Sequence, residues 1–145
     1  KKEQEEFARM QKVQQRQEKK ELILRKQQQV KNEQNRIEAE KQKQESLKQA
    51  YKNEKKEWKN ILIQLRQDST EEENHRKTKK AIDVARSLML LIPSPEKRKK
   101  VEQKLKNEFT AALVAQPQVN KHEINIQENL TTFYNELHKI TESIR

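Results

Sequence analysis

The chain contains neither glycine nor cysteine, and only three of its 145 residues are proline. An average protein of this length has about ten glycines. Phosphate-binding glycine loops, two-residue hairpin turns and dinucleotide-binding fingerprints all require glycine, so the sequence excludes them. The absence of cysteine likewise excludes disulfides, zinc–thiolate sites and catalytic thiols.

Long hydrophobic runs are also missing, because the longest apolar run is the five residues from Leu88 to Ile92. A membrane-spanning helix needs about 20 such residues. We therefore expect no membrane insertion and an intracellular protein, cytoplasmic or cytoskeletal, with a nuclear location as the alternative. Since the chain begins with Lys1 rather than Met, we expect it to be a segment of a larger protein.

Charged residues make up 39% of the chain and leave a net charge of +10. Residues 1–67 hold 19 basic and 11 acidic residues, residues 68–100 hold nine and six, and residues 101–145 hold five and six. The positive charge thus belongs to the first two thirds. It favours an acidic partner such as RNA, although the mixing of both signs is equally typical of a solvated helix surface.

Residues 1–67 lack proline as well as glycine and are rich in Lys, Glu, Gln, Arg and Leu, which lose little rotamer freedom in a helix. Apolar side chains recur in this segment every seven residues, with Gln44 in the one vacant place: Ile23, Val30, Ile37, Tyr51, Trp58 and Leu65. A full coiled coil needs a second apolar seam, which is mostly Lys, Glu or Gln before residue 47. The pattern predicts a coiled-coil-like helical arm over 1–46 with one apolar stripe. It does not favour a strong self-dimer, and a weaker homodimer is left open.

Three cap signals divide the remaining chain. Ser69 and Glu72 have capping-box spacing, Ser94 precedes a proline suited to a first helical turn, and Asn120 opens a polar run. Together they predict helices over about 47–67, 70–92, 95–116 and 121–144. The second should be the most buried, because nine of the twelve residues in 81–92 are apolar. The fourth has the most regular apolar stripe, formed by Ile126, Leu130, Phe133, Leu137, Ile140 and Ile144.

These elements predict an all-α protein in which a long N-terminal helix is joined to a small antiparallel four-helix bundle. The arm covers 1–46 and the bundle 47–145. Tyr51 and Trp58 share the heptad stripe, so we expect them to pack in a core rather than to stack on nucleic-acid bases.

No residue pattern indicates catalysis, a metal or a cofactor. His75, His122 and His138 show no helical ligand spacing, and His138 is expected at the edge of the apolar face of the fourth helix. The carboxylates alternate with Lys, which is typical of solvated ion pairs rather than of catalytic acids. We therefore expect a protein that is not an enzyme.

Two basic runs stand out near the starts of the second and third bundle helices: Arg76, Lys77, Lys79 and Lys80, and Lys97, Arg98, Lys99 and Lys100. They are candidates for a phosphate-contacting patch or a nuclear-import signal, or are simply solvated surface. Ser94 followed by Pro95 also fits a proline-directed phosphorylation site, although the capping role explains the same residues.

The sequence predicts a structural or scaffold segment, or an adaptor subunit of a complex, that binds a protein helix or lattice through the arm. The expected anchors are Ile23, Val30 and Ile37, with a second contact at Phe7, Met10 and Val13. The alternative is a basic helical subunit associated with nucleic acid or a ribonucleoprotein, contacting phosphates through the Lys/Arg runs.

Overall fold

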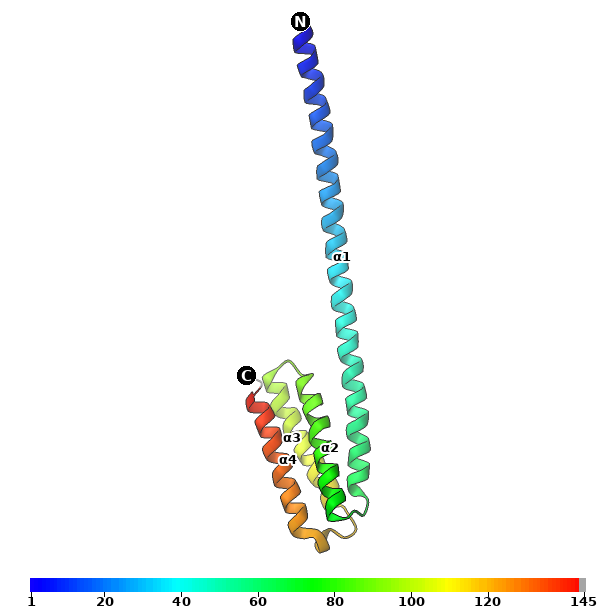
Figure 1. Ribbon diagram of the computed structural model, residues 1–145, viewed down its shortest axis with the longest axis vertical. Helices are drawn as coiled ribbons and strands as arrows, with labels where there is room; N and C mark the ends of the chain where they lie inside the picture. The colour runs from blue at the N-terminus through cyan, green and yellow to red at the C-terminus, as the bar shows by residue number, and fades with distance from the viewer. Residues whose placement is uncertain (144–145) are drawn as a thin grey trace. The chain divides into compact units, whose positions relative to one another are not determined.

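The computed structural model describes residues 1–143, which are 91% helical and contain no strand. In chain order the elements are α1 (Lys2–Arg66), α2 (Glu71–Leu90), α3 (Pro95–Val114), a 3₁₀ turn η1 (Val119–His122) and α4 (Glu123–Ser143) (Figure 1). The all-α prediction, with a long N-terminal helix and a helical bundle, is confirmed.

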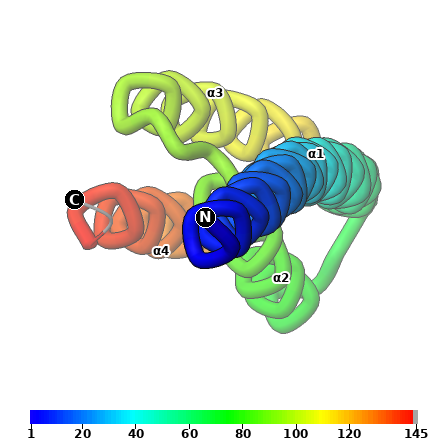
Figure 2. The backbone as a smooth tube through the Cα atoms, turned by 90° about the horizontal axis from the view of Figure 1, so that it is seen from above, coloured from blue at the N-terminus to red at the C-terminus, as the bar shows by residue number. Residues whose placement is uncertain are grey.

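The chain divides into two compact units, Lys1–Ser46 and Leu47–Arg145, and α1 contributes to both. In the first unit every residue is exposed. In the second unit, successive helices run in opposite directions (Figure 1), as the predicted antiparallel bundle requires. Seen end-on, the helices surround a common centre, and α4 packs along both α2 and α3 (Figure 2).

The bundle core is built around three aromatic side chains from three helices. Phe133 stacks on Phe109 with ring centroids 4.0 Å apart and on Trp58 at 5.9 Å. The Trp58 indole N–H donates to the Glu108 carboxylate over 3.2 Å, so its polar edge is satisfied while the ring is buried. The expected core role of Trp58 is confirmed, and Tyr51 packs against the same core.

Helix α2 contributes more buried residues than any other helix, as its composition predicts. Seven of the nine apolar residues in 81–92 are buried. The structure differs at Leu90, which is 58% exposed, because α2 ends there and Leu91 already forms its C-cap. On α4 the predicted stripe is buried from Ile126 to Ile140, with Leu130 half-buried, whereas Ile144 lies outside the described residues.

The first cap prediction is wrong by one residue. Thr70, not Ser69, is the N-cap of α2, and its hydroxyl oxygen accepts from the Glu73 backbone N–H over 3.2 Å. Ser69 is occupied elsewhere, because its hydroxyl donates to the Gln67 carbonyl and accepts from Lys77. The capping-box spacing therefore holds one position later in the chain, between Thr70 and Glu73.

The sequence also predicts where the third and fourth bundle helices begin. Ser94 caps α3 with Pro95 in the first turn, as expected. After α3, Asn120 does not cap a helix directly but lies within η1, and α4 begins three residues later at Glu123. The predicted helix over 121–144 thus starts with a 3₁₀ turn, which commonly precedes an α-helix.

Candidate functional site

The arm presents Ile23, Val30 and Ile37, hereafter the arm stripe, to solvent. Their exposed fractions are 55%, 57% and 44%. A helix advances 100° per residue, so side chains seven residues apart differ by only about 20° around the axis. Since α1 is continuous through this region, the three side chains form one narrow apolar line.

The proposed second contact lies elsewhere on the same helix. Counting back from Val30 at 100° per residue places Met10 about 160°, and Phe7 about 140°, around the axis. Both are exposed, as is Val13. One straight partner helix therefore cannot cover Phe7 and Met10 together with the arm stripe. Val13 lies between them, about 60° around the axis from Met10 and about 80° from Ile23.

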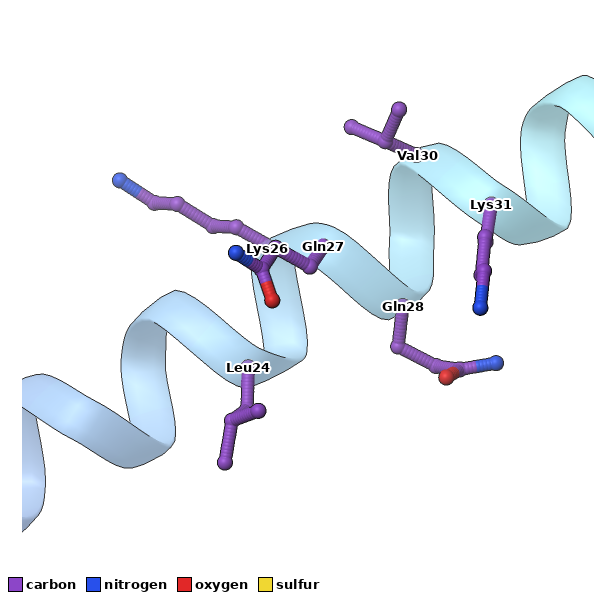
Figure 3. A pocket seen from close by; sticks show the side chains of 6 residues that line it. All are labelled: Leu24, Lys26, Gln27, Gln28, Val30 and Lys31. Atoms are coloured by element: carbon purple, nitrogen blue, oxygen red, sulfur yellow. The ribbon is translucent and has the colours of Figure 1, made fainter.

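The surroundings of Val30 are polar and open. Figure 3 shows the residues that line a pocket here: Lys26 and Val30 extend to one side of the helix, and Leu24, Gln28 and Lys31 to the other. Because these side chains sit on one helix and diverge, they enclose no volume for a small ligand. The site is a convex surface suited to another helix.

Ion pairs connect successive turns beside the arm stripe. The Arg36 guanidinium contacts Glu33 at 2.6 Å and Glu40 at 3.8 Å. The hydrogen bond that Arg36 donates to the Glu33 carboxylate and the negative charge of Glu40 raise the pKa of Arg36 above its ordinary value. These groups are exposed, so each pair adds little to stability.

One cation of the first basic run has a structural role. Lys77 Nζ donates to the Gln64 carbonyl oxygen at 2.8 Å and to the Ser69 hydroxyl. Gln64 lies in the last turn of α1, whose carbonyl groups lack helical partners. Helices commonly end on a glycine. This chain has none. Instead, the Gln64 carbonyl accepts both from the Gln67 backbone N–H at 3.2 Å and from Lys77. Arg76, Lys79 and Lys80 are exposed.

The second basic run also contributes one structural cation. Arg98 is buried, and its guanidinium donates to the carbonyl oxygens of Ile92 at 2.7 Å and Pro93 at 3.1 Å. It thereby fixes the loop between α2 and α3. Lys97, Lys99 and Lys100 are exposed.

The two basic runs do not form one surface. The first lies near the start of α2 and the second near the start of α3, and these helices run antiparallel (Figure 1). The first run reaches the middle of α2, whereas the second occupies the first turns of α3, so their centres lie roughly 13 Å apart along the bundle axis at 1.5 Å per residue. Each run presents three exposed cations.

Ser94 is half-buried at the start of α3, where its hydroxyl oxygen accepts from the Lys97 backbone N–H at 3.5 Å. This contact is the capping interaction that the sequence predicts. Phosphorylation of Ser94 stays a prediction.

The histidines gather no ligand set. His138 is exposed beside Glu142, and His122 lies 3.5 Å from Glu71. Within residues 1–143, no three side chains of the His, Asp and Glu types come together as a metal site. Over the same residues no helix has both the length and the apolar character needed to cross a bilayer.

Two buried polar groups have no signal in the sequence. The Gln116 amide donates to the Leu65 carbonyl and to Asn74 Oδ1, at 2.8 and 2.7 Å, and Asn74 in turn donates to Asn125. On α3 and α4, buried Glu102 binds Lys106 at 2.9 Å and accepts from the Thr141 hydroxyl at 2.7 Å. Both groups join helices rather than form a ligand site.

Comparison with models of protein families, with curated protein sequences and with solved structures finds no match to this chain.

Proposed function

We propose that this chain is a non-enzymatic scaffold or adaptor segment whose arm binds a helical protein partner along the arm stripe. One observation carries the proposal: Ile23, Val30 and Ile37 form a continuous apolar line on a helix in which no side chain of residues 1–46 is buried.

A solvated helix of this length needs a source of stability. Most helix stability in proteins comes from packing an apolar face, not from intrinsic propensity. The arm has good propensity but no packed face. A partner helix laid along the arm stripe supplies the missing contact, with the aliphatic side chains as anchors in a coiled-coil-like pairing.

The bundle is a separate part of this proposal. Its core contains no residue before Trp58, and its partly buried neighbours begin at Tyr51. The bundle can therefore fold around its own core while the arm engages a partner. This division is the arrangement expected of an adaptor, in which one end is a folded domain and the other a binding helix.

The alternative function is phosphate binding by a nucleic-acid-associated subunit. The observation favouring it is the set of exposed cations in the two basic runs: Arg76, Lys79, Lys80, Lys97, Lys99 and Lys100. Binding of this kind is sequence-independent and falls by orders of magnitude between about 50 and 200 mM salt. A contact through the apolar stripe depends much less on salt.

Affinity capture from extract, with and without nuclease treatment and at both salt concentrations, separates the two functions. The test variant carries Ile23→Ala, Val30→Ala and Ile37→Ala, which keep a strong helix former at each position. The control carries Glu21→Ala, Gln28→Ala and Asn35→Ala on the far face. We expect the wild type and the control to retain the same protein at both salt concentrations and the stripe variant to lose it. Equal retention by all three would contradict the proposal, and binding that depends on RNA and low salt would support the alternative.

A further inference from the structure

Charged residues beside the arm stripe follow the same seven-residue spacing. Lys19, Lys26, Glu33 and Glu40 form a single edge of the stripe, each about 40–60° around the helix from the neighbouring apolar residues of the stripe. All four are exposed on the continuous helix α1. Along this edge the sign of the charge changes once, from positive to negative, at Val30.

The arm stripe is also symmetric about Val30. Ile23 lies seven residues before it and Ile37 seven residues after it. On the charged edge, Lys26 lies four residues before Val30 and Glu33 three residues after it. One heptad farther out, Lys19 lies eleven residues before Val30 and Glu40 ten residues after it. Reversing the helix direction about Val30 therefore exchanges each apolar residue of the stripe with an apolar one and each Lys of the charged edge with a Glu. On the opposite edge the reversal places Lys20 beside Lys41, a pair of like charges.

We propose that the helical partner of the arm is a second copy of this chain, paired antiparallel with its two-fold axis at Val30. The inference rests on the proposed function of the arm stripe. In this pairing Val30 meets Val30 of the second copy and Ile23 meets its Ile37. A two-fold axis perpendicular to antiparallel helices brings their equivalent edges together.

The charged edge determines the direction of the pairing. In the antiparallel dimer Lys26 lies beside Glu33 of the second copy, and Lys19 beside its Glu40, which gives four ion pairs by symmetry. In a parallel coiled coil the same positions face themselves. Lys26 would then meet Lys26 and Glu33 would meet Glu33, an arrangement of like charges that disfavours association. Charge complementarity thus selects the antiparallel second copy.

The contacts that Arg36 makes within its own helix are compatible with this pairing. It binds Glu33 and Glu40, but an ionised carboxylate offers about four acceptor positions. Both carboxylates are exposed and can also accept from a Lys of the second copy. Lys26 and Val30 extend to the same side of the helix (Figure 3), as the shared interface requires.

Disulfide trapping tests the register, because the chain has no cysteine of its own. Single variants Val30→Cys, Ile23→Cys, Ile37→Cys and Gln28→Cys are equilibrated in a glutathione redox buffer. We expect Val30→Cys to form a covalent dimer and Gln28→Cys, on the far face, to form none. Ile23→Cys and Ile37→Cys should cross-link when mixed but not alone. Self-linking of Ile23→Cys as efficiently as Val30→Cys would show a parallel pair and overturn the proposal.

Variants that exchange the charges of Lys26 and Glu33 provide an independent test, in which sedimentation equilibrium measures the dissociation constant of the dimer. Lys26→Glu places two symmetry-related carboxylate pairs in the dimer and should weaken dimerisation about tenfold. Adding Glu33→Lys restores opposite charges and should restore the wild-type dissociation constant. A wild-type protein that stays monomeric at all accessible concentrations would overturn the second-copy proposal.

The two proposals fail in distinguishable ways. A monomeric chain that captures a different helical protein through the arm stripe refutes only the second copy. A dimer that persists unchanged in the Ile23→Ala, Val30→Ala and Ile37→Ala variant shows that the stripe is not the dimer contact and refutes the second copy. Equal capture of a helical protein by the wild type and this variant refutes the proposed function as well.

Discussion

Arg98 donates from its guanidinium Nε to the carbonyl oxygen of Ile92 over 2.7 Å, in a buried position at the turn between α2 and α3. The same guanidinium reaches the Pro93 carbonyl at 3.1 Å. A residue in the middle of a run of four cations thus determines the geometry of a loop. Arg98 satisfies carbonyls of the loop beyond α2, whereas the last-turn carbonyls of Leu88 and Met89 accept from the Leu91 backbone N–H.

Removal of this donor should destabilise the bundle. Arg98→Ala leaves the buried Ile92 carbonyl and the partly buried Pro93 carbonyl without the charged partner. It should lower the free energy of unfolding by about 1–3 kcal/mol. Trp58 is the only tryptophan and lies in the core, so its fluorescence during urea unfolding reports on the bundle alone.

The matched control is the neighbouring Lys99→Ala, which changes an exposed cation of the same run. Its effect should stay within about 0.5 kcal/mol. Equal unfolding midpoints for the two variants would show that the Arg98 contacts do not contribute to stability.

A second prediction concerns the amide network at the other end of the bundle. Gln116 is 2% exposed and donates both to the end of α1, at the Leu65 carbonyl, and to Asn74 on α2. Gln116→Ala leaves both acceptors unsatisfied and should cost about 1–3 kcal/mol.

Gln118→Ala, two residues later on the exposed side of the same loop, is the control. In chemical denaturation only the Gln116 variant should lose stability. If hydrogen exchange also shows faster opening at the end of α1 in that variant, the network is what joins α1 to the rest of the bundle.

Periodicity makes most of the fold predictable, because burial on a helix repeats with the helical turn. The buried residues Phe133, Leu137 and Ile140 follow from spacing alone, and Pro93 and Pro95 mark the turn before α3. Cap positions are less certain, since Ser69 and Thr70 both have a Glu three residues later. In the folded protein the Ser69 hydroxyl accepts from Lys77, and the Thr70 hydroxyl caps the helix.

The buried polar residues could not be predicted. Arg98 is indistinguishable in sequence from Lys97 and Lys99, and its burial depends on loop carbonyls that exist only in the folded bundle. Asn74 and Gln116 resemble the many exposed amides of the chain, although both are at most 2% exposed. Their partners lie about 40 residues or more away along the chain. The exposure of the arm stripe, in contrast, could be predicted from the sequence, because the arm lacks a second apolar seam.

A third prediction addresses the buried ion pair of Glu102 and Lys106. Glu102→Ala removes the acceptor of both Lys106 and Thr141 and should cost about 3 kcal/mol, because a largely buried ammonium loses its counter-charge. Lys106→Ala should also destabilise the bundle.

The double variant separates pairing from side-chain packing. When both charges are removed, no ion is left unpaired, so the double variant should be more stable than the two single effects predict in sum. Additive effects in urea unfolding would show that the two side chains act independently.

The last prediction tests whether the arm and the bundle are energetically independent. The variant Ile23→Ala, Val30→Ala and Ile37→Ala changes only exposed side chains of the first unit. The unfolding free energy reported by Trp58 should therefore change by less than about 0.5 kcal/mol. By comparison, Phe109→Ala removes a fully buried ring and should cost about 3–5 kcal/mol. A loss of similar size in the stripe variant would mean that the arm contributes to the bundle core. In that case the apolar line of the arm could not serve as a free surface for a partner.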